Sequence, residues 1–222
     1  MDIDRLRNVT PRPYRFSRIE LRDIAVSVLV LSLAFVILFR GSNFIHYFED
    51  KLGDLWALGL LGLMVVIVIL SFVTHELGHK FTAQKLGLWS EYRMFPMGLL
   101  FTLVMSFVGF LIAAPGVVYI NGYADPADDG KISVAGPAVN IVLAIVGLAG
   151  CLVFNHSGMV IPFYLLFILN SSLALFNLLP IGILDGAKIL RWDSTVWVLC
   201  TAVAGVLFVS RLIGLVPDLY FA

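Results

Sequence analysis

The apolar stretch LWALGLLGLMVVIVILSFV, residues 55–73, continues without a break into THELGHKFTAQ, residues 74–84. The first part has the length and composition of a helix that crosses a bilayer, for which about 20 apolar residues suffice. The second part brings two histidines, a glutamate and a lysine within a few residues of one another. Ionisable side chains at membrane depth cost roughly 3 kcal/mol each, so their presence here indicates a functional site.

The composition of the whole chain also indicates a membrane protein. Of its 222 residues, 60% are hydrophobic and 14% are charged, and the mean hydropathy is +0.96. Soluble domains are nearer one half apolar and one quarter charged. The formal net charge is zero, which gives no indication of a nucleic-acid partner. Cys151 and Cys200 lie inside apolar runs, where they are typical of buried thiols rather than of disulfides.

Further apolar runs of spanning length recur along the chain. We predict transmembrane helices at residues 24–39, 54–83, 132–154, 158–179 and 194 to about 216. No linker or internal repeat separates these runs, so residues 1–222 are predicted to form a single integral membrane domain. Residues 1–23 form a polar, arginine-rich segment, and the apolar run after it lacks a cleavage signature. We expect that run to be a retained anchor rather than a signal peptide.

One apolar run, residues 97–119, is ambiguous. It leads into APGVVYINGYADP, where glycine, proline and alternating Val, Tyr and Ile are typical of strands and turns. We predict a re-entrant or membrane-associated β segment here, with a sixth crossing helix as the alternative. The predicted fold class is an all-α polytopic membrane protein with about five to six transmembrane helices and a small β segment after the HELGH helix.

The distribution of basic residues favours the re-entrant alternative. If the N-terminus is cytoplasmic and residues 97–119 do not cross, most of the 15 Lys and Arg residues lie on the inner side. If the run crosses, the bias towards the inner side weakens. The positive-inside rule therefore favours five spans with a cytoplasmic N-terminus.

The HELGH sequence at residues 75–79 has the spacing of a metal site. Residues four apart lie on one face of a helix, so His75 and His79 can reach one ion. Imidazole is a good zinc ligand, and Glu76 is placed to take a proton from a water bound to the metal, as in H-E-x-x-H metalloproteases. The alternative is that both histidines are interfacial residues at the end of a membrane helix.

A third ligand is offered by FNLLPIGILDGAKIL, residues 176–190. Asp185 follows an apolar run, and Gly186 after it permits a tight backbone turn. An ordinary loop turn is the alternative for an isolated Asp-Gly pair. In the re-entrant arrangement Asp185 and HELGH reach the same side of the bilayer, whereas a crossing run would put them on opposite sides.

Three motifs together resemble the site-2 protease family of intramembrane zinc metalloproteases. They are HELGH, the stretch AGPAVN at residues 135–140, which is similar to G-P-x-x-N, and an N-x-x-P-x-x-x-L-D-G pattern at residues 177–186. The resemblance covers a catalytic core of about residues 54–191. It implies one Zn²⁺ ion on His75, His79 and Asp185, with Glu76 as the catalytic base.

The resemblance also implies that Asn140 and Asn177 lie near the site and position the substrate or the oxyanion. From the residues alone, each could equally hydrogen-bond neighbouring helices. We expect a minimal core without PDZ-like or CBS-like domains.

The expected function is hydrolysis of peptide bonds within or next to transmembrane segments of membrane proteins, that is, regulated intramembrane proteolysis. The expected partners are such a substrate and the lipid bilayer, without nucleic acid. We expect a multi-pass protein of a prokaryotic cell membrane whose active site opens to the cytoplasm. The alternative is a transporter or a metal-binding membrane protein without protease activity, for which the inverted repeats typical of transporters are not found.

Overall fold

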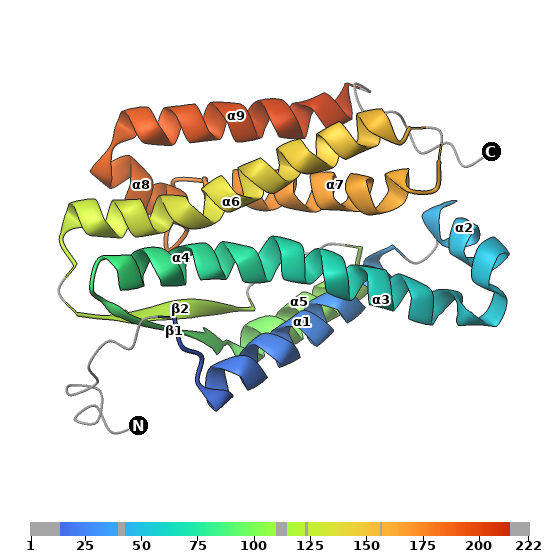
Figure 1. Ribbon diagram of the computed structural model, residues 1–222, viewed down its shortest axis with the longest axis horizontal. Coiled ribbons are helices and arrows are strands. Elements are labelled where there is room, and N and C mark those ends of the chain that lie inside the picture. Colours follow the sequence, from blue (N-terminus) through green and yellow to red (C-terminus); the bar gives the residue numbers. More distant parts are fainter. Residues whose placement is uncertain (1–13, 40–42, 110–114, 123, 156, 214–222) are drawn as a thin grey trace.

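The computed structural model describes residues 14–39, 43–109, 115–122, 124–155 and 157–213. Within these ranges the chain is mostly helical and forms an elongated bundle (Figure 1). Five of its helices are long and apolar enough to cross a membrane: Arg18–Leu38, Glu49–Lys85, Pro126–Val153, Val160–Asn177 and Ser194–Leu212. The prediction of a polytopic α-helical membrane protein is confirmed.

The elements follow one another in the order α1 (Arg18–Leu38), α2 (Asn43–Leu52), a 3₁₀ turn (Gly53–Leu55), α3 (Trp56–Val68), a π-helical turn (Ile69–Val73), α4 (Thr74–Lys85), β1 (Trp89–Met94), α5 (Pro96–Phe107), β2 (Gly116–Asn121), α6 (Pro126–Val153), α7 (Val160–Asn177), α8 (Asp185–Trp192) and α9 (Ser194–Leu212). No PDZ-like or CBS-like unit is present among the described residues.

Two helices begin earlier than hydropathy predicts. Helix α1 begins at residue 18 rather than 24, and α6 at residue 126 rather than 132. Each start is capped: Ser17 Oγ accepts from the backbone N–H of Glu20, and Asp125 Oδ1 accepts from that of Asp128. Such caps satisfy the first N–H groups of a polar turn, which a hydropathy average does not detect. The predicted end of the last span, near residue 216, lies outside the described residues.

Helices α4 and α6 occupy the middle of the bundle. Helix α6 packs against α4 and α7, while α9 packs against α7 and α8 (Figure 1). A Cβ atom at Gly78 of α4 would lie 3.0 Å from the carbonyl oxygen of Ala135 on α6. Glycine at this position therefore lets the two helices approach closely.

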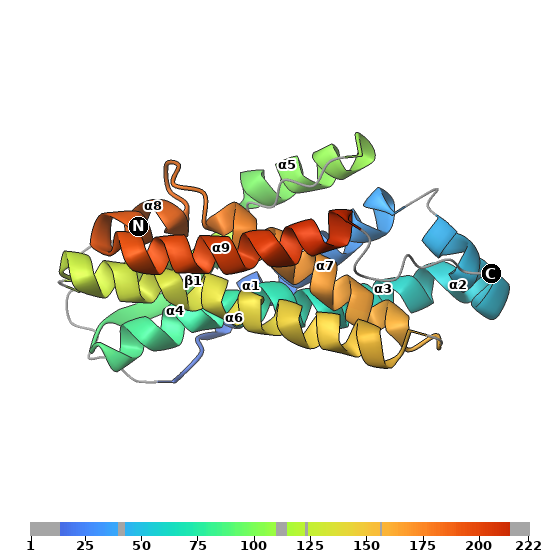
Figure 2. The same ribbon diagram turned by 90° about the horizontal axis from the view of Figure 1, so that it is seen from above.

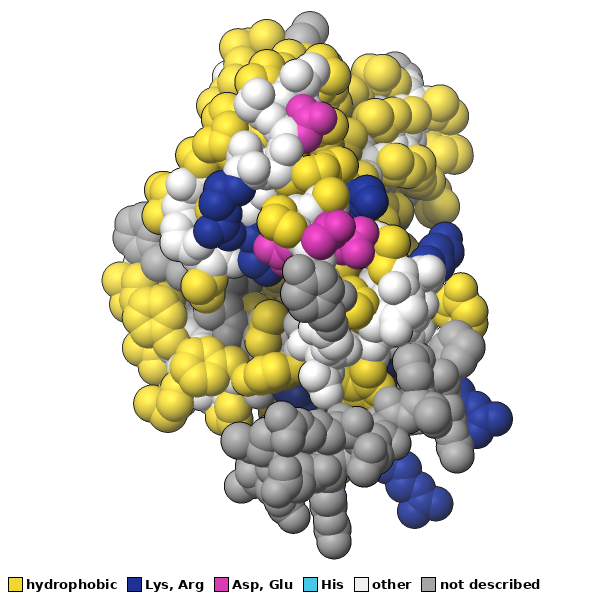
Figure 3. Space-filling view, turned by 90° about the vertical axis from the view of Figure 1, so that its left-hand side faces the viewer, with side chains coloured by type: hydrophobic (Ala, Val, Ile, Leu, Met, Phe, Trp, Pro, Cys, Tyr) yellow, Lys and Arg dark blue, Asp and Glu magenta, His cyan; other side chains and the backbone are white. Residues whose placement is uncertain are grey.

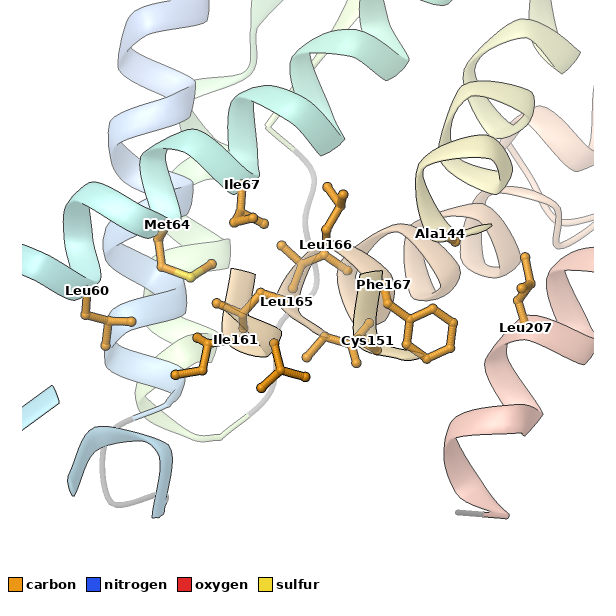
Figure 4. Close-up of a cluster of buried hydrophobic side chains, with 13 residues drawn as sticks. Leu60, Met64, Ile67, Ala144, Cys151, Ile161, Leu165, Leu166, Phe167 and Leu207 are labelled. Carbon is orange, nitrogen blue, oxygen red and sulfur yellow. The ribbon is translucent and has the colours of Figure 1, made fainter. Parts of the chain in front are cut away.

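A cluster of buried apolar side chains holds the helices together in the part of the bundle that is distant from HELGH. Leu60 and Met64 of α3 lie near Leu165 of α7, with Phe167 and Cys151 further along the same cluster (Figure 4). Cys151 is a buried free thiol and Cys200 a half-buried one, as expected from their apolar surroundings.

The start of α1 is attached to α4 by a buried ion pair. Lys80 Nζ donates to Glu20 Oε1 at 2.7 Å and to Oε2 at 2.6 Å, and neither side chain is exposed to solvent. The backbone N–H of Tyr92 in β1 donates to Glu20 at 3.0 Å, and Lys80 Nζ lies 3.9 Å from the centre of the Phe16 ring. Lys80 is thus a buried structural cation rather than a charge at the membrane surface.

The segment after α4 runs from β1 through α5 to β2, and β2 lies beside β1. Strands β1 and β2 pair antiparallel with Met94 opposite Gly116, and the N–H of Phe95 donates to the carbonyl of Pro115 at 2.8 Å. Helix α5 between the strands has 12 residues, fewer than the approximately 20 that a span needs. The predicted β segment after the HELGH helix is confirmed, and its two strands pair with α5 between them along the chain.

The secondary structure within residues 97–119 differs from the prediction. Only the part from Gly116 onwards is a strand, its partner β1 lies before the run, and Pro96–Phe107 is helical. Pro96 stands in the first turn of α5, where its fixed φ favours a helix, and leucine, methionine and phenylalanine follow. Figure 2 shows α5 at one side of the molecule, apart from α6, α7 and α9.

The polar ends of several helices lie at one end of the bundle. Helix α4 ends there, α6 begins there, and α8 lies beside them (Figure 1). Figure 3 views this end and shows acidic and basic side chains among hydrophobic ones. The HELGH and LDG sequences therefore lie towards the same end of the bundle, as the re-entrant arrangement requires.

Candidate metal centre

Three side chains from α4 and α8 form a group that could hold a metal ion. One ligand atom each of His75, His79 and Asp185 lies within 4.8 Å of the other two. The two Nε2 atoms are 3.0 Å apart, and Asp185 Oδ2 lies 3.4 Å from His75 Nε2 and 3.2 Å from His79 Nε2. Ligands at about 2.0–2.1 Å in tetrahedral geometry are about 3.3 Å from one another, so this triangle has the size of a zinc site.

The chain reversal before α8 positions the carboxylate. Gly182 has a φ of +58° and makes the turn, and Asp185 then begins α8. Gly186 is helical, and its function differs from the predicted one. A Cβ atom there would lie 2.1 Å from the carbonyl oxygen of Leu178, so glycine allows α8 to begin against the end of α7. The turn predicted at Gly186 is therefore made at Gly182.

Hydrogen bonds to the far side of each imidazole ring fix its tautomer. His79 Nδ1 lies 2.8 Å from the carbonyl oxygen of Ile132, which can only accept, so Nδ1 carries the proton. His75 Nδ1 lies 2.5 Å from Asn140 Oδ1, whose Nδ2 in turn donates to the carbonyl of Ser71 at 3.0 Å. Both Nε2 atoms are left with a lone pair, as metal-binding histidines require.

These acceptors need a cation between them. Two Nε2 lone pairs and a carboxylate oxygen point at one place, and only a proton or a metal ion can make that arrangement favourable. Burial raises the pKa of the Asp185 carboxyl, but a proton on the adjacent His79 or His75 ring holds it well below its usual range. The carboxylate is therefore ionised. Two histidines and a carboxylate are a ligand set found in catalytic zinc sites, so zinc fits these residues.

Gly136 provides the space for the imidazole rings. A Cβ atom at this position of α6 would lie 2.4 Å from His79 Nε2 and 2.7 Å from His75 Cε1. The AGPAVN stretch thus lies directly against the metal-binding group. The sequence identified the stretch but not this function of its glycine.

Glu76 and the candidate ligands line a cleft of about 380 Å³ between α4, α8 and β2. Within the described part of the chain, the Glu76 carboxylate has no hydrogen-bond partner. Val117 and Tyr119 of β2 also line the cleft and are half exposed. A carboxylate next to a metal ligand is thus open towards a space that could receive a substrate.

The two predicted asparagines lie in different surroundings. Asn177 lines the cleft, and its Nδ2 donates to the carbonyl of Leu173 at 3.0 Å. Asn140 is fully buried behind His75 and is absent from the described residues that line the cleft.

Sequence reasoning missed two residues near the site. Asn170 of α7 is fully buried and contacts Asn140, and Lys188 of α8 lines the cleft. Asn170 could have been identified from the sequence as an amide within the apolar run 158–179, because polar groups at that depth need partners. The spacing of three residues from Asp185 was a signal for Lys188, because residues three apart share a helix face.

Known proteins resemble this chain over much of its length. The sequence model of peptidase family M50 matches residues 63–158 and 153–197, more than half of the chain. A relative described as "Putative zinc metalloprotease MJ0611", from Methanocaldococcus jannaschii, is 33% identical over 187 residues, which are 83% of this chain and 90% of that protein. "Putative zinc metalloprotease YwhC" of Bacillus subtilis is 32% identical over 61% of this chain and 71% of its own length.

A further relative, "Zinc metalloprotease MJ0392" of Methanocaldococcus jannaschii, is 30% identical over 58% of this chain and 33% of its own length. No solved structure matches the chain at a comparable level of significance. The family match, the relatives and the apolar helices agree with the ligand set on α4 and α8. The chain belongs to peptidase family M50, the site-2 proteases, and is a zinc metallopeptidase that passes through the membrane several times.

Proposed function

We propose that this peptidase cleaves peptide bonds within or next to transmembrane segments of other membrane proteins. The observation that carries the proposal is the place of the metal-binding group. His75 lies about 28 Å along a continuous helix from Trp56, at 1.5 Å per residue, close to the thickness of the hydrocarbon core of a bilayer. A site at this depth is within reach of water and of the end of a neighbouring membrane helix.

His75, His79 and Asp185 are the proposed zinc ligands. The three side chains come from two helices, and the hydrogen bonds behind both rings hold their Nε2 atoms towards the carboxylate. When bound, zinc supplies a Lewis acid that acidifies water and polarises a carbonyl group.

Glu76 is the proposed general base and acid. Its carboxylate faces the cleft beside His75 without a protein partner among the described residues, so it is free to take a proton from the attacking water. The same carboxylate then gives the proton to the leaving nitrogen. Asn177 has a second amide hydrogen, beyond the one given to Leu173, for the oxygen of the scissile bond.

The substrate is proposed to bind as an extended segment. A helix buries its carbonyls in hydrogen bonds, so a transmembrane substrate must unwind locally before attack. Among the described residues β2 pairs with β1 alone, and it lines the cleft through Val117 and Tyr119. Its other edge is suited to pairing with an extended chain. Such pairing would lay the substrate backbone across the cleft.

The orientation in the membrane also belongs to the proposal. A cytoplasmic N-terminus and an active site that opens to the cytoplasm agree with the excess of basic residues on that side. We also propose that the protein lies in a prokaryotic cell membrane and takes part in regulated intramembrane proteolysis.

The positions of the cleavage sites test this proposal. The purified protein would be placed in lipid nanodiscs with single-span substrates, and the products would be identified by mass spectrometry. We expect cuts within or next to the transmembrane segment. Cuts confined to water-exposed loops, or cleavage of soluble unfolded proteins at an equal rate, would contradict it.

A further inference from the structure

A chain of buried polar groups runs from α7 through α6 to His75. Asn170, Asn140 and Ser71 have essentially no exposed surface, and His75 is 5% exposed. Such a chain is unusual in a bundle otherwise packed with apolar side chains, and the water-poor interior of a membrane protein offers no substitute partners. Its hydrogen bonds can be followed from one end to the other.

The orientation of Asn170 is fixed by its own helix. Asn170 Nδ2 donates to the carbonyl of Leu166 at 2.8 Å and to Ser71 Oγ at 2.8 Å. Because a carbonyl can only accept, the amide nitrogen must lie on this side. The oxygen Oδ1 therefore points the other way, towards α6, and accepts from Asn140 Nδ2 at 2.7 Å.

Asn170 in turn fixes Asn140. The two hydrogens of Asn140 Nδ2 go to Asn170 Oδ1 and to the carbonyl of Ser71, both of which accept. Asn140 Oδ1 is left facing His75 Nδ1, which must then be the protonated nitrogen. Reversing the Asn140 amide would set oxygen against two oxygens, and would move the His75 proton to Nε2, where it blocks the metal.

The π-helical turn Ile69–Val73 supplies the anchor of this chain. Ser71 lies within it and offers two acceptors, its carbonyl to Asn140 and its hydroxyl oxygen to Asn170. Single π-helical turns within α-helices occur frequently at functional sites. The turn directly precedes HELGH, so both asparagines are held from the same helix that carries the histidines.

We infer that Asn170, which touches neither metal nor substrate, is a positioning residue that acts through Asn140 to keep the lone pair of His75 Nε2 directed at the metal. The inference rests on the proposed role of His75 as a zinc ligand. It gives Asn140 the role of an outer partner of His75 in place of the expected contact with the substrate. Outer partners of metal-binding histidines typically change metal affinity 10–100-fold.

Zinc affinity tests the inference without a measurement of proteolysis. Zinc dissociation constants of the purified protein in detergent would be measured by competition with a chelator. We expect about tenfold weaker binding in Asn170→Leu, and a 10–100-fold loss in Asn140→Leu. Ser171→Ala is the matched control, because it removes a buried hydroxyl from the next position of α7 that bonds only the carbonyl of Ile168 in the described structure. Its zinc affinity should equal that of the wild type.

The double variant separates a positioning role from general damage. If Asn170 acts through Asn140, Asn140→Leu/Asn170→Leu binds zinc as Asn140→Leu alone does, because the second change has nothing left to disturb. The visible spectrum of the cobalt-substituted protein should shift in Asn170→Leu, since the direction of a ligand changes.

Two results would overturn the inference: wild-type zinc affinity and cobalt spectrum in Asn170→Leu, or fully additive losses in the double variant. If Asn170→Leu does not fold, Asn170→Ala replaces it with the same expected outcomes. His75→Ala separates this inference from the proposed function. Zinc bound by the wild type and lost from His75→Ala supports the metal site whatever the Asn170 variants do.

Discussion

Asp185 is the one of the three candidate ligands that α4 does not carry, and its carboxylate lies 3.2 Å from His79 Nε2. Asp185→Ala should weaken zinc binding more than 100-fold, above the range for outer partners, because a direct ligand is lost. Asp50→Ala is the control, since Asp50 is exposed on α2. Equal zinc affinity in both variants, measured by chelator competition, would exclude Asp185 as a ligand.

The Glu20–Lys80 pair is a buried ion pair that attaches the start of α1 to α4, the helix that carries HELGH. Glu20→Gln leaves the Lys80 ammonium buried with a neutral partner, and removing one charge of such a pair costs roughly 3–5 kcal/mol. We expect a clear fall in the thermal unfolding temperature in detergent.

Lys131→Gln is the control for this change, because both side chains of the Lys131–Asp128 pair are partly exposed and such a pair contributes little. If Glu20→Gln unfolds at the same temperature as Lys131→Gln, the buried pair does not stabilise the protein.

At the scale of the elements, the close approach of α6 to the rings of α4 depends on Gly136. A methyl group there would lie 2.4 Å from His79 Nε2, so Gly136→Ala should displace a ring or separate the helices. We expect at least a tenfold loss of zinc affinity, because the change disturbs a ligand ring directly and loss of an outer partner alone typically costs 10–100-fold.

Gly62→Ala on α3 is the matched control, because a Cβ atom there has no neighbour within 4 Å. It should keep zinc affinity and can raise stability by up to about 1 kcal/mol, the difference in helix propensity. Wild-type zinc affinity in Gly136→Ala would show that α4 and α6 can accommodate a methyl group at this position, and would contradict the prediction.

The sequence predicted those elements whose signal is local. The spacing of His75 and His79 needs only one helix, and the five spans need only apolar length. Residues 97–119 were harder, because the partner strand of β2 lies before the run and α5 separates the two. The π-helical turn at Ile69–Val73 contains neither glycine nor proline, so nothing in its sequence distinguishes it from the helix around it.

At the scale of the whole molecule, the same end of the bundle carries both parts of the site. The sequence predicted that Asp185 and HELGH lie close together, since the re-entrant arrangement puts both motifs on the same side of the bilayer. The contacts of Asn140, Asn170 and Gly136 depend on how α4, α6 and α7 pack, which no single segment encodes.

The orientation in the membrane can be checked by labelling single cysteines. In a variant without Cys151 and Cys200, Lys131→Cys lies near the start of α6 and Met159→Cys lies beyond its end. We expect an impermeant thiol reagent to label Lys131→Cys from the cytoplasmic side and Met159→Cys from the opposite side. Labelling of both from one side, or the reverse pattern, would contradict the proposed orientation.

The central claim is that zinc on α4 and α8, with Glu76 beside it, hydrolyses membrane-embedded substrates. Its most direct test measures zinc content and cleavage of a transmembrane substrate in the same samples of wild type and Glu76→Gln. We predict a single zinc ion per chain in both proteins, with cleavage reduced about 10²–10⁴-fold in Glu76→Gln, because the general base is lost while the ligands remain. Equal cleavage by the two proteins, or cleavage by wild type freed of zinc, would contradict the claim.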